Sequence, residues 1–262
     1  MKRDVQKLLN EKFQQFNQTD FIAHDPISIP HLFSDFQNQE IMGFWVSILS
    51  WGQRKTILKK AHELIDLMDG NPFQFIQQFE EKDLKRFEQF KHRTFQYPDT
   101  LYFLHFFQRH YKNHSSLEAA FTIDFSENEI NTEKALNNFY TYFFNDEWLL
   151  PRTKKHISRP ASKSACKRIN MFLRWMVRKD SNGVDLGIWK TIQPRQLICP
   201  LDVHVQRQAE ILGLIPSTPA SWKLAVDLTN ELKKLDPIDP VKYDFALFGL
   251  GIEAKNCRTV EL

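Results

Sequence analysis

Glycine and cysteine are scarce in this chain. Its 262 residues include 8 glycines and 3 cysteines. Few glycines leave few positions for tight turns between strands, whereas long segments repeat apolar residues at helical spacing. Cys166, Cys199 and Cys257 are far apart and odd in number, so they form no disulfide framework and no zinc or iron–sulfur spacing. These absences predict an all-α protein that requires no metal and no cofactor.

Long apolar runs and a signal peptide are also lacking. No stretch stays apolar over the roughly 20 residues that a membrane helix requires, and the first residues do not form a cleavable leader. Together with the sparse cysteines, this favours a reduced compartment. We therefore expect a cytoplasmic, monomeric protein with no membrane partner.

Acidic residues are absent from residues 151–179, although the whole chain carries a net charge of only +3. Such a local block of one sign suggests a polyanionic partner, with nucleic acid as the leading candidate. The simpler alternative is a solvated basic surface. We call residues 151–179 the basic block; its ten cations are Arg152, Lys154, Lys155, Arg159, Lys163, Lys167, Arg168, Arg174, Arg178 and Lys179.

The basic block contains a helix that should present two different faces. Its apolar residues follow the i, i+4, i+7, i+8 spacing of an amphipathic helix: Ala165, Ile169, Phe172, Leu173, Met176 and Val177. Arg174 and Arg178 fall within about 20° of Lys167 on another side, at 100° per residue. We expect the apolar stripe to be buried and the basic stripe to be exposed.

Two aspartates precede segments with helical patterns. Asp202 comes directly before a short helix over residues 203–212, which Gly213 closes. Because an N-cap aspartate accepts backbone N–H bonds and meets the positive end of the helix dipole, Asp202 should stay ionised. Asp239 followed by Pro240 predicts a second N-cap, opening a helix that reaches residue 248.

The remaining pattern predicts helices over residues 38–49, 55–68 and 221–235. The first of these is the most hydrophobic segment of the N-terminal half, so we expect it to be the central core helix. No repeat and no linker composition is evident. The chain should therefore form one unit over residues 1–262, with two compact lobes and a cleft between them.

The segment PLDVHVQRQAEILGL, residues 200–214, resembles the P-V-D-x-H-V-x-R-x-x-x-R-L-G-L segment of the helix-hairpin-helix DNA glycosylases. This superfamily includes endonuclease III and the 8-oxoguanine glycosylases. Upstream, SILSWGQRKT resembles the superfamily's L-L-S-x-Q-x-(T/S) turn after a core helix. Most of residues 38–260 also resembles a bacterial family of unknown function that shares SACKR-x-N-M-F-L-R-W-M-V-R and is related to this superfamily.

The resemblance implies base-excision repair by a glycosylase with AP lyase activity. Its partner would be double-stranded DNA with a damaged or mispaired base, flipped out of the duplex. Asp202 matches the superfamily's essential carboxylate, and Lys167 the lysine that attacks the sugar C1′. A helix N-terminus and neighbouring cations disfavour the ammonium form, as a nucleophilic lysine requires. Lys163 stays the alternative nucleophile because it lies nearer the position of the hairpin lysine in the best-known members.

The resemblance, the basic block and the general chemistry of side chains give further residues expected roles. Gln53, Trp51 and His204 are the expected substrate contacts, and the expected DNA contacts are Arg54, Lys163, Arg168, Arg174 and Arg178. The chain departs from the best-known members in three ways. Its hairpin stretch ISRPASKS has no glycine, Lys167 and Asp202 are 35 residues apart, and the four-cysteine iron–sulfur loop is absent. Two alternatives remain: a non-catalytic DNA-binding protein with this fold, and a monofunctional glycosylase that uses Asp202 alone.

Overall fold

Helices are the regular structure of the protein. The computed structural model describes residues 2–146 and 149–260, and within these ranges one isolated bridge, between His92 and Phe95, is the closest approach to a β-strand. The all-α prediction is confirmed. The α-helices are α1 (Lys2–Phe16), α2 (Thr19–Ile22), α3 (Phe36–Leu49), α4 (Arg54–Leu67), α5 (Pro72–Gln78), α6 (Tyr97–Tyr111), α7 (Glu118–Phe121), α8 (Glu133–Phe143), α9 (Lys167–Val177), α10 (Val203–Ile211), α11 (Trp222–Lys233) and α12 (Tyr243–Val260).

Short 3₁₀ helices join several of these elements. They are η1 (Pro26–Ser28), η2 (Pro30–Leu32), η3 (Glu81–Phe87), η4 (Pro151–His156), η5 (Pro160–Ser162), η6 (Pro194–Gln196) and η7 (Pro240–Lys242). Six of the seven start with proline, whose fixed φ suits the first position of a helical turn. Among the described helices, none has both the length and the apolarity to cross a bilayer.

The chain divides into two compact units whose segments alternate along the sequence. Unit 1 comprises residues 1–23, 127–132 and 159–262, and unit 2 comprises residues 24–126 and 133–158. The basic block is therefore divided between the units after residue 158. Because the chain passes repeatedly from one unit to the other, no single linker marks a boundary, in agreement with the absence of a linker composition.

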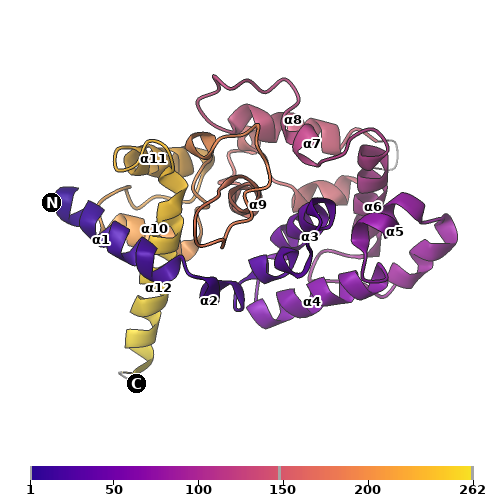
Figure 1. Ribbon diagram of the computed structural model, residues 1–262, viewed down its shortest axis with the longest axis horizontal. Coiled ribbons are helices and arrows are strands. Elements are labelled where there is room, and N and C mark those ends of the chain that lie inside the picture. Colours follow the sequence, from indigo (N-terminus) through magenta and orange to yellow (C-terminus); the bar gives the residue numbers. More distant parts are fainter. Residues whose placement is uncertain (1, 147–148, 261–262) are drawn as a thin grey trace. The chain divides into compact units, whose positions relative to one another are not determined.

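Unit 2 is built around α3, as the hydrophobic pattern of residues 38–49 predicts. Asp35 caps this helix by accepting a hydrogen bond from the Asn38 amide at 3.1 Å. The Phe44 ring contacts phenylalanines of α6 and α8, including Phe107 at 5.7 Å and Phe139 at 5.6 Å between ring centroids. Each such aromatic pair stabilises a core by about 0.5–1.5 kcal/mol beyond burial of its area. Figure 1 shows α3 among the helices of its unit.

A buried polar network also holds unit 2 together. Glu40, in the middle of α3, is fully buried and accepts hydrogen bonds from the Tyr111 hydroxyl and the Leu117 amide, both at 2.9 Å. Ser116 donates a third. The backbone oxygen of Ser116 accepts from Nε2 of His110 at 2.9 Å, so Nδ1 of the neutral ring accepts from a tyrosine hydroxyl. Burial lowers the pKa of His110 to about 4.

This histidine should make the stability of unit 2 depend on pH. An unfolded histidine binds a proton near pH 6.5, but His110 in the folded protein binds one only near pH 4. The unfolded state therefore binds more protons between these values, and the free energy of unfolding should fall by up to about 1.4 kcal/mol per unit as pH decreases. Urea unfolding at pH 7.5 and 4.5 measures this. The stability advantage over His110→Gln should shrink at pH 4.5.

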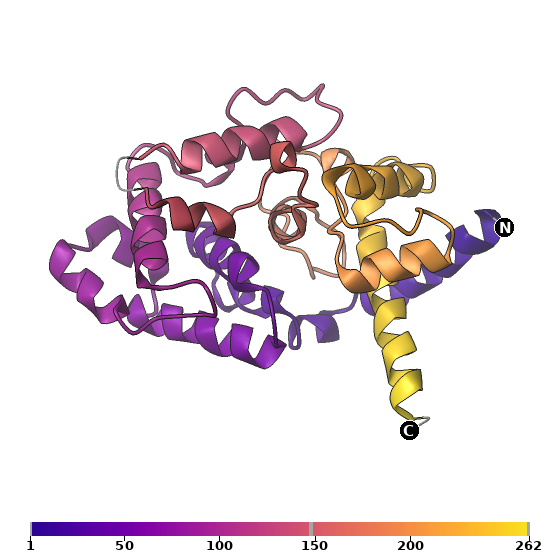
Figure 2. The same ribbon diagram turned by 180° about the vertical axis from the view of Figure 1, so that it is seen from behind.

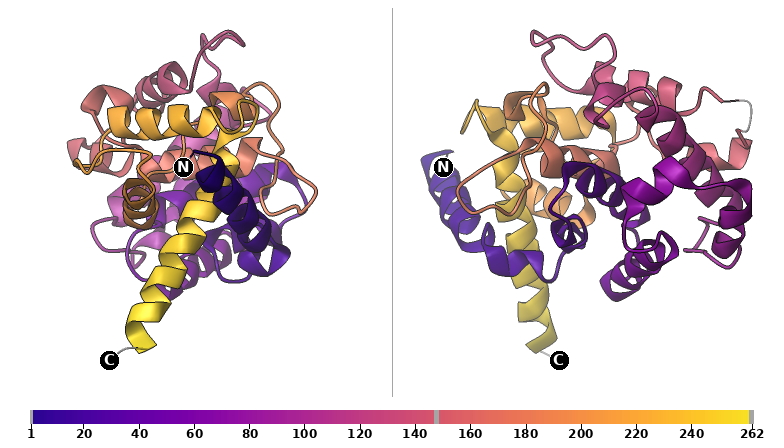
Figure 3. Two further views of the ribbon diagram at one scale, coloured as in Figure 1. Left: turned by 90° about the vertical axis from the view of Figure 1, so that its left-hand side faces the viewer. Right: turned by 45° about the vertical axis from the view of Figure 1, so that its right-hand side comes forward.

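In unit 1, α1 and α10 pack against α12. Two glycines of α12 permit the close approach: a Cβ at Gly249 would lie 2.0 Å from the Phe16 ring, and one at Gly251 would lie 2.8 Å from Cβ of His204. Figure 2 shows α10 crossing α12, and the left view in Figure 3 shows α1 beside α12. The first turn of α10, which carries Asp202 as its cap, is thereby held against α12.

Candidate functional site

Helix α9 is buried on all sides over residues 169–177, which corrects the expectation of an exposed basic stripe. Arg174 is 5% exposed and Arg178, which follows the helix, is 1% exposed. The connector between α9 and α10 covers the helix, and its Leu186 and Trp189 amides donate to carbonyls of α9 at 2.8 Å. The prediction that Arg174 and Arg178 contact DNA is therefore wrong, because neither guanidinium reaches the surface.

Four carboxylates neutralise these two arginines. Asp185 accepts from both, at 3.2 Å from Nε of Arg174 and 3.0 Å from Nη1 of Arg178. Arg178 also pairs with Asp239 at 2.9 Å and with Asp180 at 2.7 Å, while Arg174 pairs with Asp244. Although burial opposes the charge, Asp185, Asp239 and Asp180 hold the pKa of Arg178 above its usual value.

The segment before α9 has two left-handed residues that are not glycine. Lys163 has φ 58° and Cys166, the N-cap of α9, has φ 51°. The Lys163 amide donates to the Pro160 carbonyl at 2.7 Å, and its carbonyl accepts from the Trp222 amide at 3.2 Å. The hairpin stretch thus reaches left-handed geometry without glycine. It leaves the Lys163 side chain exposed and places Lys167, which is partly exposed, at the first position of α9.

Asp202 is the N-cap of α10, as predicted. Its Oδ1 accepts from the Val205 amide at 2.8 Å, and its side chain is partly exposed. The second predicted cap behaves differently. Asp239 precedes η7 but makes no side-chain cap hydrogen bond, because its carboxylate pairs with Arg178 instead.

Asp244, in the first turn of α12, is buried and pairs with Arg174 of α9. Burial is the main reason that the pKa of Asp244 is raised to about 6. Arg174 and Lys167 lower this pKa, and the negative charge of Asp202 raises it. Lys167 and Asp202 therefore both lie close enough to Asp244 to act on its ionisation. Both charges thus act on a buried carboxyl group that the sequence pattern did not single out. An aspartate in the first turn of a helix interacts favourably with the helix dipole. Because this role is common, the sequence alone gave no reason to assign a second role to Asp244.

Cys199 and His204 flank Asp202 in the sequence. Cys199 is fully buried, and burial together with the charges of Asp244 and Asp202 raises the pKa of its thiol far above the usual value. It is therefore a neutral thiol and not a nucleophile. His204 is partly exposed; its ring packs against Gly251 and meets Phe248 edge-on at 6.0 Å. Where the structure describes side chains, no three His, Cys, Asp or Glu residues gather as a metal site would require.

The other predicted substrate and DNA contacts, Trp51, Gln53 and Arg54, belong to unit 2. Gln53 precedes α4 with an exposed side chain that makes no cap hydrogen bond, and Arg54 is exposed at the first position of that helix. The Trp51 ring is partly covered, since the Arg93 guanidinium lies 5.0 Å from its centre and His92 meets it edge-on. Arg93 therefore occupies a ring face on which a base could otherwise stack.

Burial also lowers the number of cations in the basic block that could contact DNA. Arg168 is partly buried, and desolvation lowers its pKa. In unit 2, Arg152 lies 3.3 Å from the buried Asp99, which also accepts from Thr153. The cations of the block with exposed side chains are Lys154, Lys155, Lys163 and Lys179.

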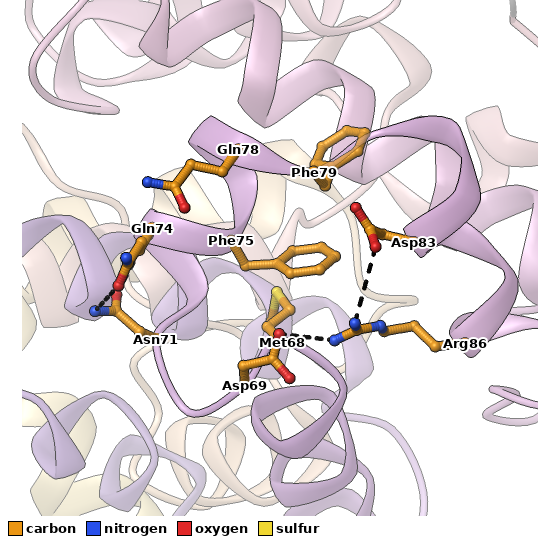
Figure 4. Close-up of a pocket in the computed structure, with 9 residues that line it drawn as sticks. All are labelled: Met68, Asp69, Asn71, Gln74, Phe75, Gln78, Phe79, Asp83 and Arg86. Atoms are coloured by element: carbon orange, nitrogen blue, oxygen red, sulfur yellow. Dashed lines mark hydrogen bonds and ion pairs between the residues drawn. The ribbon is translucent and has the colours of Figure 1, made fainter.

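Unit 2 contains a separate hollow of about 300 Å³. Figure 4 shows Arg86 reaching across it between Asp69, at 2.8 Å, and Asp83, at 4.0 Å. The guanidinium also lies over Phe75 at 5.3 Å. Its charge is neutralised within the hollow, and no residue predicted from the sequence lines it. Its lining is Met68, Asp69, Asn71, Gln74, Phe75, Gln78, Phe79, Asp83 and Arg86.

Comparison with known proteins gives one result. Residues 25–253 match the family described as protein of unknown function DUF2400. The chain belongs to this family, and the match includes Lys167, Asp202 and Asp244. No curated protein and no solved structure matches the chain.

Proposed function

We propose that this protein is a DNA glycosylase of the helix-hairpin-helix superfamily with AP lyase activity, in which Lys167 is the nucleophile and Asp202 the catalytic carboxylate. The observation that supports the proposal is a buried carboxyl group, Asp244, which pairs with Arg174 of α9 and whose ionisation is influenced by the charges of both Lys167 and Asp202. Arg174 lies seven residues after Lys167, two helical turns along the same face. Its ion pair with Asp244 ties α9 to α12, and α10 is held against α12 at Gly251. Three elements thus support one lysine and one carboxylate.

The proposed chemistry needs only these groups and the substrate. The neutral Lys167 amine attacks C1′ of the sugar, and the base leaves with the electron pair of the glycosidic bond and takes up a proton. The ionised Asp202 stabilises the positive charge that develops on the sugar. The covalent intermediate opens to an iminium, loss of a proton from C2′ expels the 3′-phosphate, and water releases the lysine.

Borohydride trapping tests this proposal. The unmutated protein, incubated with a duplex containing an abasic site and with a panel of damaged bases, should give a covalent complex after reduction of the imine. Lys167→Gln should abolish trapping and strand cleavage. Lys163→Gln, an exposed lysine four residues earlier, is the matched control and should only weaken binding.

Each of the other outcomes would support a different mechanism or function. Trapping that survives Lys167→Gln and disappears in Lys163→Gln would exchange the two lysines. Base excision without trapping would favour a monofunctional glycosylase that uses Asp202 alone. DNA binding without excision, cleavage or trapping on any lesion would contradict the enzymatic proposal and favour a non-catalytic DNA-binding protein.

A further inference from the structure

Three segments of unit 2 contain cations and no acidic residue. They are residues 50–62, which include the turn before α4, residues 89–98, which include the 92–95 turn closed by the isolated bridge, and residues 149–158, which include η4. Their basic residues are Arg54, Lys55, Lys59, Lys60, Lys91, Arg93, Arg152, Lys154 and Lys155.

The 92–95 turn contacts both of the other segments. The Arg93 guanidinium lies 5.0 Å from the centre of the Trp51 ring, and a Cβ at Gly52 would lie 2.5 Å from its Nη2. At the next residue, the Thr94 carbonyl accepts a hydrogen bond from Nη2 of Arg152 at 3.1 Å. The three segments, which are far apart in the sequence, are therefore neighbours within one unit.

Most of these cations have no carboxylate partner. Lys60 pairs with Glu63 at 2.7 Å, and Arg152 lies 3.3 Å from the buried Asp99. Like charges that are close together repel one another, and a polyanion that binds beside them removes this repulsion. The cations that are exposed and form no ion pair with any residue that the structure describes are Arg54, Lys55, Lys59, Lys91, Arg93, Lys154 and Lys155.

Arg93 is held in position before any partner binds. Its guanidinium packs against Trp51 and against the backbone of Gly52, where φ is 104° and a side chain would collide with it. A side chain that is already ordered loses less conformational entropy when it binds. The planar guanidinium suits two phosphate oxygens at once. Arg54 and Lys55, two and three residues after Gly52, bring further exposed cations to the same turn.

We propose that unit 2 binds the phosphate backbone of double-stranded DNA through Arg93 and the exposed cations of the two adjoining segments. The inference rests on the proposed function for the choice of DNA as the polyanion, and it uses neither Lys167 nor Asp202. Contacts from lysine and arginine to phosphate carry no sequence information, so this surface should bind undamaged DNA of any sequence. Such contacts let a protein slide along DNA, which a lesion-specific enzyme needs before it meets its substrate.

A salt series tests the proposal through equilibrium binding alone. Fluorescence anisotropy measures the affinity of the full chain for an undamaged DNA duplex. The logarithm of the association constant falls with the logarithm of the salt concentration, with a slope of about −0.9 for each phosphate neutralised. The triple variant Lys55→Gln, Arg93→Gln, Lys154→Gln changes one residue in each segment. It should bind more weakly at low salt, and its slope should be shallower by about 2.7.

A second triple variant removes the same charge elsewhere in unit 2. Lys82, Lys85 and Lys112 are exposed and lie outside the three segments. Substitution of all three by glutamine should leave the slope unchanged. Lys154→Gln alone, which keeps the contact between Arg93 and Trp51, should make the slope shallower by about 0.9. This single variant keeps the test valid if the first triple variant fails to fold.

The outcomes separate this proposal from the enzymatic one. A shallower slope in the first triple variant alone supports the surface even if no lesion gives a trapped complex. Equal slopes in the two triple variants overturn it even if trapping succeeds, and so does a failure to bind DNA at low salt. Two competitors identify the polyanion. Tighter binding of duplex RNA, or displacement of DNA by polyglutamate at equal charge concentration, would show that the assignment to DNA is wrong.

Discussion

Asp185→Asn is expected to destabilise the protein by about 3–5 kcal/mol, the cost of removing one partner from a buried ion pair. Asp185 is 3% exposed and accepts from both Arg174 and Arg178. Asparagine has nearly the same shape, so the substitution opens no cavity. It leaves two buried guanidiniums with one carboxylate fewer, and their desolvation is then poorly compensated. Since domains are typically stable by about 5–15 kcal/mol, the variant should lose a large part of its folding free energy.

Urea unfolding compares this variant with Asp227→Asn. Asp227 forms an exposed pair with Lys223 on α11, so its loss should cost at most about 1 kcal/mol. Equal effects of the two substitutions would show that the ionic cluster around α9 contributes no more than a surface pair. The same comparison explains why reversing the charge of Arg174 or Arg178 would not report on DNA binding: such variants should lose the fold first.

The proposed glycosylase mechanism predicts that Asp202→Asn lowers the rate of base excision by at least about 100-fold while the fold stays intact. Asparagine caps a helix about as well as aspartate, so the hydrogen bond to the Val205 amide can be kept. In that mechanism the substitution removes the negative charge next to the sugar, and removing one stabilising group from a transition state typically costs about 100-fold to 1,000-fold. DNA binding should be unchanged or tighter, because a negative charge near the phosphates is removed.

Single-turnover excision and urea unfolding of the same variants separate chemistry from stability. Asp202→Ala should lose both the activity and about 1 kcal/mol of capping energy. Ser221→Ala removes the cap of α11, where the serine hydroxyl accepts from the Leu224 amide at 3.2 Å, and should lose stability alone. If Asp202→Asn excised bases at the unmutated rate, Asp202 would be only a helix cap.

The Lys163 and Asp239 positions show where local sequence rules are insufficient. ISRPASKS contains no glycine, so its pattern did not predict left-handed backbone, yet Lys163 adopts it because the Pro160 carbonyl and the Trp222 amide hold the turn from both sides. Asp239 before Pro240 has the pattern of a helix cap. A buried arginine 61 residues away is the stronger partner, because an ion pair compensates a desolvated charge better than a backbone amide does.

Local apolar periodicity and capping residues were enough to predict several helices of this protein. The apolar pattern of residues 38–49 identified the core helix, and the order of Asp202 and the following residues identified its cap, because both signals depend on neighbours within one or two turns. Tertiary structure decided the rest. Arg174 and Arg178 have the spacing of an exposed stripe, but carboxylates from residues 180–244 neutralise them in the core of unit 1. Asp244 pairs with Arg174, and Gly251 lets α10 pack closely against α12, only after helices far apart in sequence have packed together. Such contacts between distant segments leave no periodic signal in the chain.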